Sequence, residues 1–220
     1  GMDNPQVIEA KKRGLPVWMQ GEAVGKFMEN HVGISVIGSH GKTTTAGLLA
    51  TLLVKSGLDP SYIVGSGSMR PLGPAGHRGK GEHFIAEGDE YANEPSYDKT
   101  PKFLYQYPKT IIVTNIDFDH PDLFADINQV SRAFLQFLQT LPSDGVAIIN
   151  GDDSELRKMK PLISARTVTY GRSAMNDFTL TKVGTIPHNT TFFATHKDMD
   201  LGEFTIGIPA WIQTVGGDVH

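Results

Sequence analysis

The chain has 220 residues, and its 20 Lys and Arg residues are outnumbered by 24 Asp and Glu residues, which gives a formal net charge of −4 at pH 7. A mildly acidic chain lacks the basic surface that nucleic-acid binding requires, so we expect no nucleic-acid partner. The sequence contains no cysteine, which excludes disulfide bonds, zinc–thiolate sites and cysteine nucleophiles. No apolar run approaches the roughly 18 residues of a membrane span, and the first residues do not resemble a secretory signal, so we expect a cytoplasmic protein with no membrane partner.

The first elements in chain order are short. Residues 7–13 and 21–30 are predicted to be helices, and residues 15–19 are predicted to be a strand. The apolar face of the second helix is predicted to consist of Val24, Phe27 and Met28.

From residue 32 onward, predicted strands alternate with predicted helices. The strands are β-branched or apolar runs at residues 34–37, 62–64, 83–86, 110–114, 146–149 and 167–170. The helices are predicted at residues 43–55, 126–141 and 154–159, and a glycine-rich loop is predicted at residues 65–81. The buried face of the first of these helices is predicted to consist of Leu48, Leu49, Leu52 and Leu53. This alternation predicts an α/β fold with a mostly parallel sheet that helices flank.

A small antiparallel meander is expected after the last predicted helix. Residues 177–183, 190–195 and 201–208 are predicted strands with short connections and no helix between them. We therefore expect an antiparallel β-meander over residues 172–208, appended to the α/β core.

A candidate phosphate-binding loop joins the strand at residues 34–37 to the following helix. It reads GSHGKTTT from Gly38 to Thr45, with the first glycine two residues closer to the Gly-Lys-Thr sequence than in the common P-loop pattern. Glycines allow backbone N–H groups to approach phosphate oxygens, a lysine bridges the β- and γ-phosphates, and the next hydroxyl ligates Mg²⁺. The alternative is a glycine turn that happens to precede Lys and Thr. The residues that we expect to bind a nucleoside triphosphate here are Gly38, Ser39, His40, Gly41, Lys42, Thr43 and Thr44.

Acidic residues follow the predicted strand at residues 83–86. Residues 87–90 read EGDE, and Glu87 is the first carboxylate after the strand. Ligand sites of open α/β sheets lie at the carboxyl ends of strands, so Glu87 is a candidate Mg²⁺ ligand. The alternative is a solvated acidic turn.

A second polar segment follows the predicted strand at residues 110–114. It contains three Asp residues around His120, and a neutral imidazole is acceptable as one ligand of a metal in a triphosphate site. The alternative is that Asp119 or Asp122 caps the next helix, which begins near Asp126, and that His120 is a surface residue.

Taken together, these three segments resemble the Mur ligase family, the ATP-dependent amino-acid ligases of peptidoglycan synthesis. The resemblance covers roughly residues 3–208, and it rests on NP at 4–5, GLPV at 14–17, GSHGKTTT at 38–45, EGDE at 87–90, NIDFDH at 115–120, LP at 141–142 with Gly145, and NGDD at 150–153.

The resemblance implies a division of the chain into parts of a three-domain protein. Residues 1–31 would be the tail of an N-terminal uridine-nucleotide domain with its linker, and residues 32–208 would be the P-loop-containing central ATP-binding domain. Residues 209–220 would be the start of a C-terminal domain or a divergent tail. Most of the two flanking domains would then lie outside this chain.

The resemblance also implies the reaction and its site. An ATP-dependent ligase would join an amine to UDP-N-acetylmuramate through an acyl phosphate. Lys42, Glu87 and His120 would be the catalytic residues, Asn115 would join the nucleotide-binding residues, and Mg²⁺ would be held by Thr43, Glu87 and His120.

Two branches of the family differ in the amine that they use. One adds L-alanine, and the other adds the murein tripeptide L-Ala-γ-D-Glu-meso-diaminopimelate. Residues 89–91, 98–103 and 118–124 look more like the tripeptide branch, which we favour, whereas residues 57–60 and 114–116 look more like the L-alanine branch. A folate or poly-glutamate type ligase and an ATP-binding module that does not ligate remain alternatives.

Overall fold

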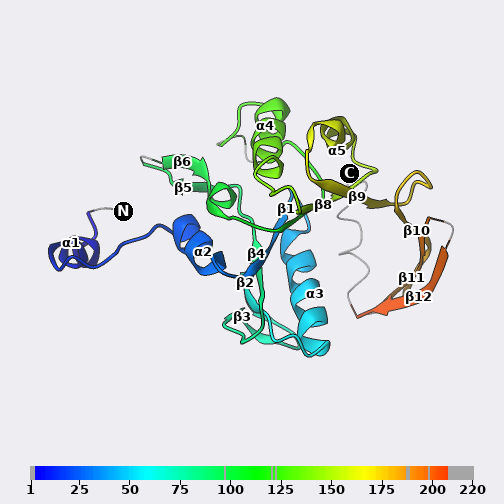
Figure 1. The fold of residues 1–220 in the computed structure, drawn as a ribbon, viewed down its shortest axis with the longest axis horizontal. Coiled ribbons are helices and arrows are strands. Elements are labelled where there is room, and N and C mark those ends of the chain that lie inside the picture. The colour runs from blue at the N-terminus through cyan, green and yellow to red at the C-terminus, as the bar shows by residue number, and fades with distance from the viewer. Residues whose placement is uncertain are drawn as a thin grey trace.

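The computed structural model describes residues 3–96, 98–119, 121, 123–186, 189–197 and 199–207. Ten strands of this part of the chain form one sheet (Figure 1). Their order across the sheet is β12 (Met199–Ile206), β11 (Asn189–His196), β10 (Phe178–Ile186), β9 (Arg166–Gly171), β8 (Val146–Asn150), β7 (Thr110–Val113), β1 (Val32–Ile37), β4 (His83–Glu87), β2 (Ser61–Met69) and β3 (Gly73–His77).

The middle of the sheet is parallel, as predicted. Strand β1 lies between β4 and β7, and it pairs with both in parallel register. The parallel pairing continues to β2 on one side and through β8 and β9 to the first residues of β10 on the other. All of these strands therefore end at the same edge of the sheet, where ligand sites of such folds form.

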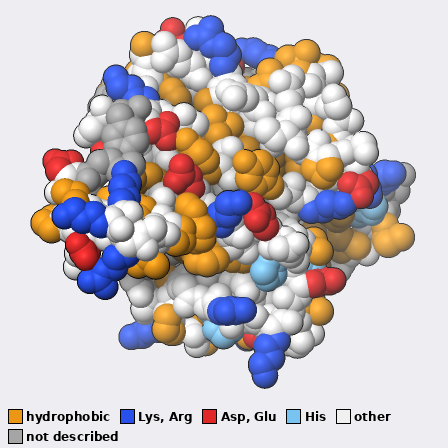
Figure 2. Space-filling view, turned by 60° about the vertical axis from the view of Figure 1, so that its left-hand side comes forward, with side chains coloured by type: hydrophobic (Ala, Val, Ile, Leu, Met, Phe, Trp, Pro, Cys, Tyr) orange, Lys and Arg blue, Asp and Glu red, His pale blue; other side chains and the backbone are white. Residues whose placement is uncertain are grey.

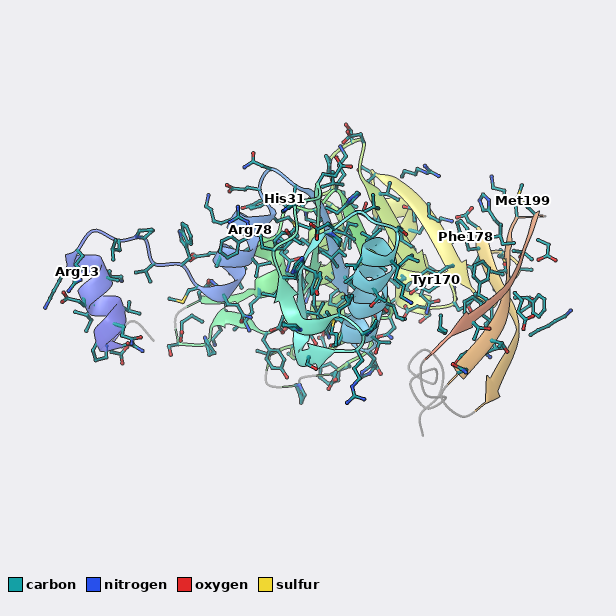
Figure 3. All side chains as sticks on the ribbon, turned by 90° about the horizontal axis from the view of Figure 1, so that it is seen from below. Arg13, His31, Arg78, Tyr170, Phe178 and Met199 are labelled. Atoms are coloured by element: carbon teal, nitrogen blue, oxygen red, sulfur yellow. The ribbon has the colours of Figure 1, made fainter. Side chains whose placement is uncertain are left out.

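The two ends of the sheet are antiparallel. Strand β3 pairs with β2 at one end, and β10, β11 and β12 form the predicted meander at the other. Because β10 pairs with β9, the meander extends the central sheet instead of forming a separate one. Figure 3 shows Tyr170 of β9 near this transition, with Phe178 and Met199 farther out on the meander.

Helices cover both faces of the parallel strands. On one face, α3 (Lys42–Lys55) packs against β1, β2 and β4. On the other, α4 (Ile127–Leu138) and α5 (Ser154–Met159) cover β7 and β8, and α2 (Gln20–Met28) covers β4. Each strand therefore contributes alternate residues to two cores: Val36 packs on the α3 side and the next residue, Ile37, packs on the α4 side.

The remaining elements are short. The structure contains α1 (Pro5–Lys12), the 3₁₀ helices η1 (Lys102–Tyr105) and η2 (Lys160–Leu162), and a hairpin of β5 (Ala92–Glu94) and β6 (Asp98–Pro101). Helix α1 has no buried residue and stands apart from the body of the protein (Figure 1). Figure 2 shows the molecule with the α1 end turned forward, and hydrophobic and charged side chains are interspersed on this face. None of the described helices is long and apolar enough to cross a membrane.

Two element predictions were wrong. Residues 15–19 form no strand, because this segment connects α1 to α2 and pairs with no strand of the described structure. The predicted loop at residues 65–81 instead contains the end of β2 and all of β3, since its glycines are accommodated in an antiparallel edge pair. The last predicted strand ends at Ile206 in the structure, and Ile208 lies outside the described residues.

The predicted buried faces of two helices also need correction. In α3, Leu48 and Leu52 are exposed, and the face toward the sheet consists of Ala46, Leu49, Ala50 and Leu53. In α2, Phe27 is exposed, and the buried face consists of Gly21, Val24, Gly25 and Met28. Both faces follow the spacing i, i+3, i+4, i+7, and the small residues mark where the helix approaches its neighbour most closely.

The core on the α4 side gives a stability prediction. Replacing Phe137 with Ala removes a ring with 0% exposed surface, whose centroid lies 5.1 Å from that of Phe103, and we expect the free energy of unfolding to fall. The expected loss, measured by urea denaturation, is about 3–5 kcal/mol. Phe27→Ala is the matched control: its side chain is 59% exposed, and its expected loss is below about 1 kcal/mol. Equal losses in the two variants would contradict this assignment of the core.

Candidate functional site

The predicted phosphate loop lies between β1 and the first turn of α3. Helix α3 begins at Lys42, and its N-cap residue Gly41 has a φ of 79°, in the left-handed region that glycine adopts without strain. Gly38 has a φ of 145°, and a Cβ atom at this position would lie 1.9 Å from the side-chain oxygen of Thr114. The loop therefore requires glycine at both positions, one for its conformation and the other for space as well.

The strand end after β7 holds this loop in place. The backbone N–H of His40 donates to Asn115 Oδ1 at 2.9 Å, and that of Ser39 donates to the carbonyl of Asn115 at 3.1 Å. Thr114 Oγ1 donates to the carbonyl of His40 at 2.5 Å, and the N–H of Asp117 donates to Ser39 Oγ at 2.8 Å. The described side-chain contacts of Asn115 are thus with the loop backbone, so this residue shapes the cradle.

Lys42 extends back across its own loop. Its Nζ donates to the carbonyl oxygens of Gly38 at 2.7 Å and Ser39 at 3.2 Å. It also lies 3.0 Å from Oε1 and 2.9 Å from Oε2 of Glu90. The ammonium is therefore held at the mouth of the loop, where a bound phosphate would meet it.

Thr43 and Glu87 lie in contact with each other. Thr43 Oγ1 donates to Glu87 Oε1 at 2.8 Å, and the N–H of Gly65 donates to Glu87 Oε2 at 2.6 Å. Gln106 fixes the backbone of Glu87. Its side-chain amide donates a hydrogen bond to the Glu87 carbonyl at 3.2 Å and accepts one from the hydroxyl of buried Ser35. A hydroxyl and a carboxylate oxygen so placed, facing a phosphate loop, form a donor set that suits Mg²⁺.

The donor set is small. Within the residues that the structure describes, no group of three His, Asp or Glu side chains could hold a metal ion by itself. Mg²⁺ in triphosphate sites keeps several waters and takes oxygens from the phosphates, so two protein ligands fit such a site. His120, the predicted third ligand, lies outside the described residues.

The capping alternative for the segment after β7 is resolved by Asp126. This residue is the N-cap of α4, and its carboxylate accepts from the N–H of Gln129 at 2.9 Å. Asp119 therefore does not cap this helix, and Asp122 lies outside the described residues.

Ion pairs and hydrogen bonds anchor the segment that follows Glu90. Lys102 Nζ lies 2.8 Å from Asp89 Oδ2, which ties η1 to the acidic segment. The carboxylate of Asp98 in β6 accepts hydrogen bonds from Tyr105 of η1 and from Asn93 of β5, and these bonds, the one from Tyr105 first, lower the pKa of Asp98 to about 2. The hairpin beside the site is therefore organised around a carboxylate that stays ionised over a wide pH range.

Tyr170 of β9 and Asp153, the N-cap of α5, make polar contacts with β7 and the segment that follows it. The hydroxyl of Tyr170 donates to the carbonyl of Val113 at 3.3 Å, and burial, with the charge of Asp153 second, raises the pKa of Tyr170 to about 12. Asp153 also accepts from the N–H of Ile116 at 2.9 Å and caps α5. These bonds hold the segment that in turn holds the phosphate loop.

Sequence reasoning missed three residues of this site. Glu90 was part of the acidic motif but was assigned no role, and Gly65 and Gln106 were not singled out. The signal for Glu90 was present, because it follows the same strand end as Glu87. Nothing in the local sequence of Gly65 or Gln106 indicates a contact with Glu87, which only the sheet brings about.

Comparison with known proteins agrees with this architecture. A family model described as the Mur ligase middle domain matches residues 36–211. The chain belongs to the Mur ligase family.

Named members of the Mur ligase family extend the comparison. The UDP-N-acetylmuramate–L-alanine ligases of Geotalea uraniireducens and of Geobacter sp. strain M21 are each 37% identical to this chain over 207 residues, covering 94% of it and 43% of the relative. The chain thus spans less than half the length of these curated relatives.

Solved structures show the same fold. The UDP-N-acetylmuramate:L-alanyl-γ-D-glutamyl-meso-diaminopimelate ligase of Neisseria meningitides matches with a TM-score of 0.81 and 23% identity, over 98% of this chain and 68% of that one. The UDP-N-acetylmuramate–alanine ligase of Thermotoga maritima matches with a TM-score of 0.74 and 18% identity, over 98% and 46% of the two chains. The predicted α/β fold of a Mur ligase central domain is confirmed.

Proposed function

We propose that this chain is the ATP-binding part of a ligase that joins an amine to the carboxylate of UDP-N-acetylmuramate. The observation that carries the proposal is that Lys42, Thr43 and Glu87 lie together where the parallel strands end, in a Mur ligase middle domain. Curated relatives at 37% identity are named as ligases of this substrate, which supports the choice of acceptor.

The proposed reaction has two steps. The substrate carboxylate attacks the γ-phosphate of ATP and ADP leaves, which gives an acyl phosphate. The amine then attacks the acyl carbon, phosphate leaves, and an amide bond results. The difficulty of the first step is the approach of an anion to a polyanion, which positioned cationic and N–H groups must offset.

The residues of this chain supply those groups. The N-terminus of α3, which begins at Lys42 after the N-cap Gly41, presents its first backbone N–H groups where the helix dipole favours a phosphate. The ammonium of Lys42 lies at the mouth of the loop and would contact the transferring phosphoryl group. Mg²⁺, when bound by Thr43 and Glu87, would offset charge on the β- and γ-phosphates, and we propose His120 for a second ion near the acyl oxygen.

Two amines are candidates, and different observations favour them. The identity of 37% with L-alanine ligases extends over 207 residues, which favours L-alanine. The segments at residues 89–91, 98–103 and 118–124 favour the murein tripeptide. We propose L-alanine first, because the identity draws on nearly the whole chain, and the tripeptide as the second candidate.

The organisation of the whole protein belongs to the same proposal. Residues 1–31 would connect to a uridine-nucleotide domain, residues 32–208 would form the ATP-binding domain, and a C-terminal domain would follow. The relatives are more than twice as long as the matched segment, which supports flanking domains. We propose a cytoplasmic location, since both nucleotide substrates are cytoplasmic metabolites.

Nucleotide binding by Lys42 is tested by calorimetry. Lys42→Ala is expected to weaken MgATP binding to the chain by about 100-fold or more, because it removes a charge-assisted contact to phosphate. Lys55→Ala, at the other end of the same helix, is the matched control and is expected to leave the affinity unchanged. Unchanged affinity in Lys42→Ala would contradict the assignment of the phosphate loop.

The two metal positions are tested by a pair of variants. Glu87→Ala is expected to weaken MgATP binding by about tenfold or more, since Glu87 would hold the ion that bridges the phosphates. His120→Ala is expected to leave MgATP affinity within about twofold, but to slow acyl-phosphate formation in the complete protein, because it acts where charge moves in the transition state. Calorimetry and acid-quenched detection of the acyl phosphate measure the two effects. Equal losses of ATP affinity would refute this division of roles.

Product analysis of the complete protein tests the reaction itself. With UDP-N-acetylmuramate and ATP, we expect an amide product with L-alanine, and the tripeptide tested in parallel decides between the two amines. The 220-residue chain alone is expected to form no amide, because most of the substrate-binding domains would be absent. ATP hydrolysis by the complete protein without product from either amine would instead favour a module that does not ligate.

A further inference from the structure

The ammonium of Lys42 already has a full set of acceptors. Its three N–H groups face four oxygens within 3.2 Å: the carbonyls of Gly38 and Ser39, and both carboxylate oxygens of Glu90. A lysine has three donors and no more. A phosphate oxygen that binds Lys42 must therefore replace one of these partners.

Glu90 is the partner that can leave. The carbonyls of Gly38 and Ser39 belong to a loop whose backbone is tied to the segment after β7, so they cannot withdraw without breaking the cradle. The carboxylate of Glu90 belongs to a side chain, which can turn about its own bonds while the backbone stays in place, and the preceding residue, Asp89, is anchored separately by Lys102.

Charge makes the replacement necessary. The side chains of Lys42 and Glu90 are only 14% and 6% exposed, so water screens their interaction poorly. A triphosphate would bring further negative charge to the same ammonium, and two anions cannot share one buried cation at low cost. The phosphate and Glu90 therefore compete for Lys42.

We propose that Glu90 is an internal competitor of the nucleotide. Between catalytic cycles its carboxylate binds the ammonium of Lys42 and keeps the lysine side chain directed into the loop, and the incoming phosphate displaces it. This proposal rests on the proposed function, because it assumes that the loop binds a triphosphate. It assigns a role to the second glutamate of the EGDE segment, beside the metal-ligand role proposed for Glu87.

The test compares Glu90→Gln with the wild-type chain by calorimetry with MgATP. The amide keeps the shape of the carboxylate and one acceptor oxygen but removes the charge, so the competing state is weakened. We expect MgATP to bind about tenfold more tightly to the variant, since apparent affinity rises with the fraction of sites free to bind. A residue with only a structural role would give the opposite result, a loss of affinity.

Asp89→Asn is the matched control. It removes a negative charge one residue away, but Asp89 contacts Lys102 and not Lys42. We expect its MgATP affinity to stay within about twofold of wild type. An equal gain in Asp89→Asn and Glu90→Gln would show a general charge effect and would overturn the proposal.

Failure of this inference is distinguishable from failure of the proposed function. If wild type binds MgATP and Glu90→Gln binds it equally or more weakly, the competition is refuted while the nucleotide site stands. If neither chain binds MgATP, both proposals fall.

A second measurement needs no variant and covers the case in which Glu90→Gln does not fold. In a crystal structure of the wild-type chain with MgATP or a non-hydrolysable analogue, we expect the Glu90 carboxylate to have left Lys42 Nζ, with a phosphate oxygen in its place. A phosphate on Lys42 with Glu90 still within 3.2 Å, the longest of the contacts of Nζ described above, would overturn the proposal.

Discussion

The position of β1 at the centre of a parallel sheet is the constraint on which the rest of the site depends. Because β1 pairs with β4 on one side and β7 on the other, three strand ends lie next to one another at a single edge. The phosphate loop leaves from β1, the acidic segment leaves from β4, and the segment that holds the loop leaves from β7. No one of these segments forms a site alone, and the backbone pairing of the sheet brings them within hydrogen-bond distance.

The loop itself is shaped by neighbours more than by its own sequence. Its glycines allow the backbone to turn, but the hydrogen bonds that fix the turn come from Thr114 and Asn115, more than seventy positions along the chain. Tyr170 of β9 and Asp153, the N-cap of α5, support that segment. A loop built in this way is preorganised, since its backbone is fixed before a ligand arrives.

A buried charge pair lies at the mouth of this preorganised loop. Lys42 and Glu90 are poorly exposed, so neither charge is easily left alone, and each anion that reaches Lys42 must take the place of another. Next to this pair, Glu87 accepts a hydrogen bond from the hydroxyl of Thr43 and another from the backbone N–H of Gly65. Internal contacts thus keep the Lys42 ammonium and the oxygens of Thr43 and Glu87 ordered.

The sequence by itself indicated the alternation of strands and helices from residue 32 onward, the glycine turn before α3 and the acidic segment after β4, because periodicity and glycine spacing are local properties. The predicted buried faces of α3 and α2 were wrong, because burial depends on the neighbouring element. Leu48, Leu52 and Phe27 face outward, and small residues of both helices form the contact faces instead. Only the tertiary structure decided that Glu90 contacts Lys42 and that Gly65 contacts Glu87. These pairs join residues 48 and 22 positions apart, and their meeting follows from strand register, which no local pattern in the chain encodes.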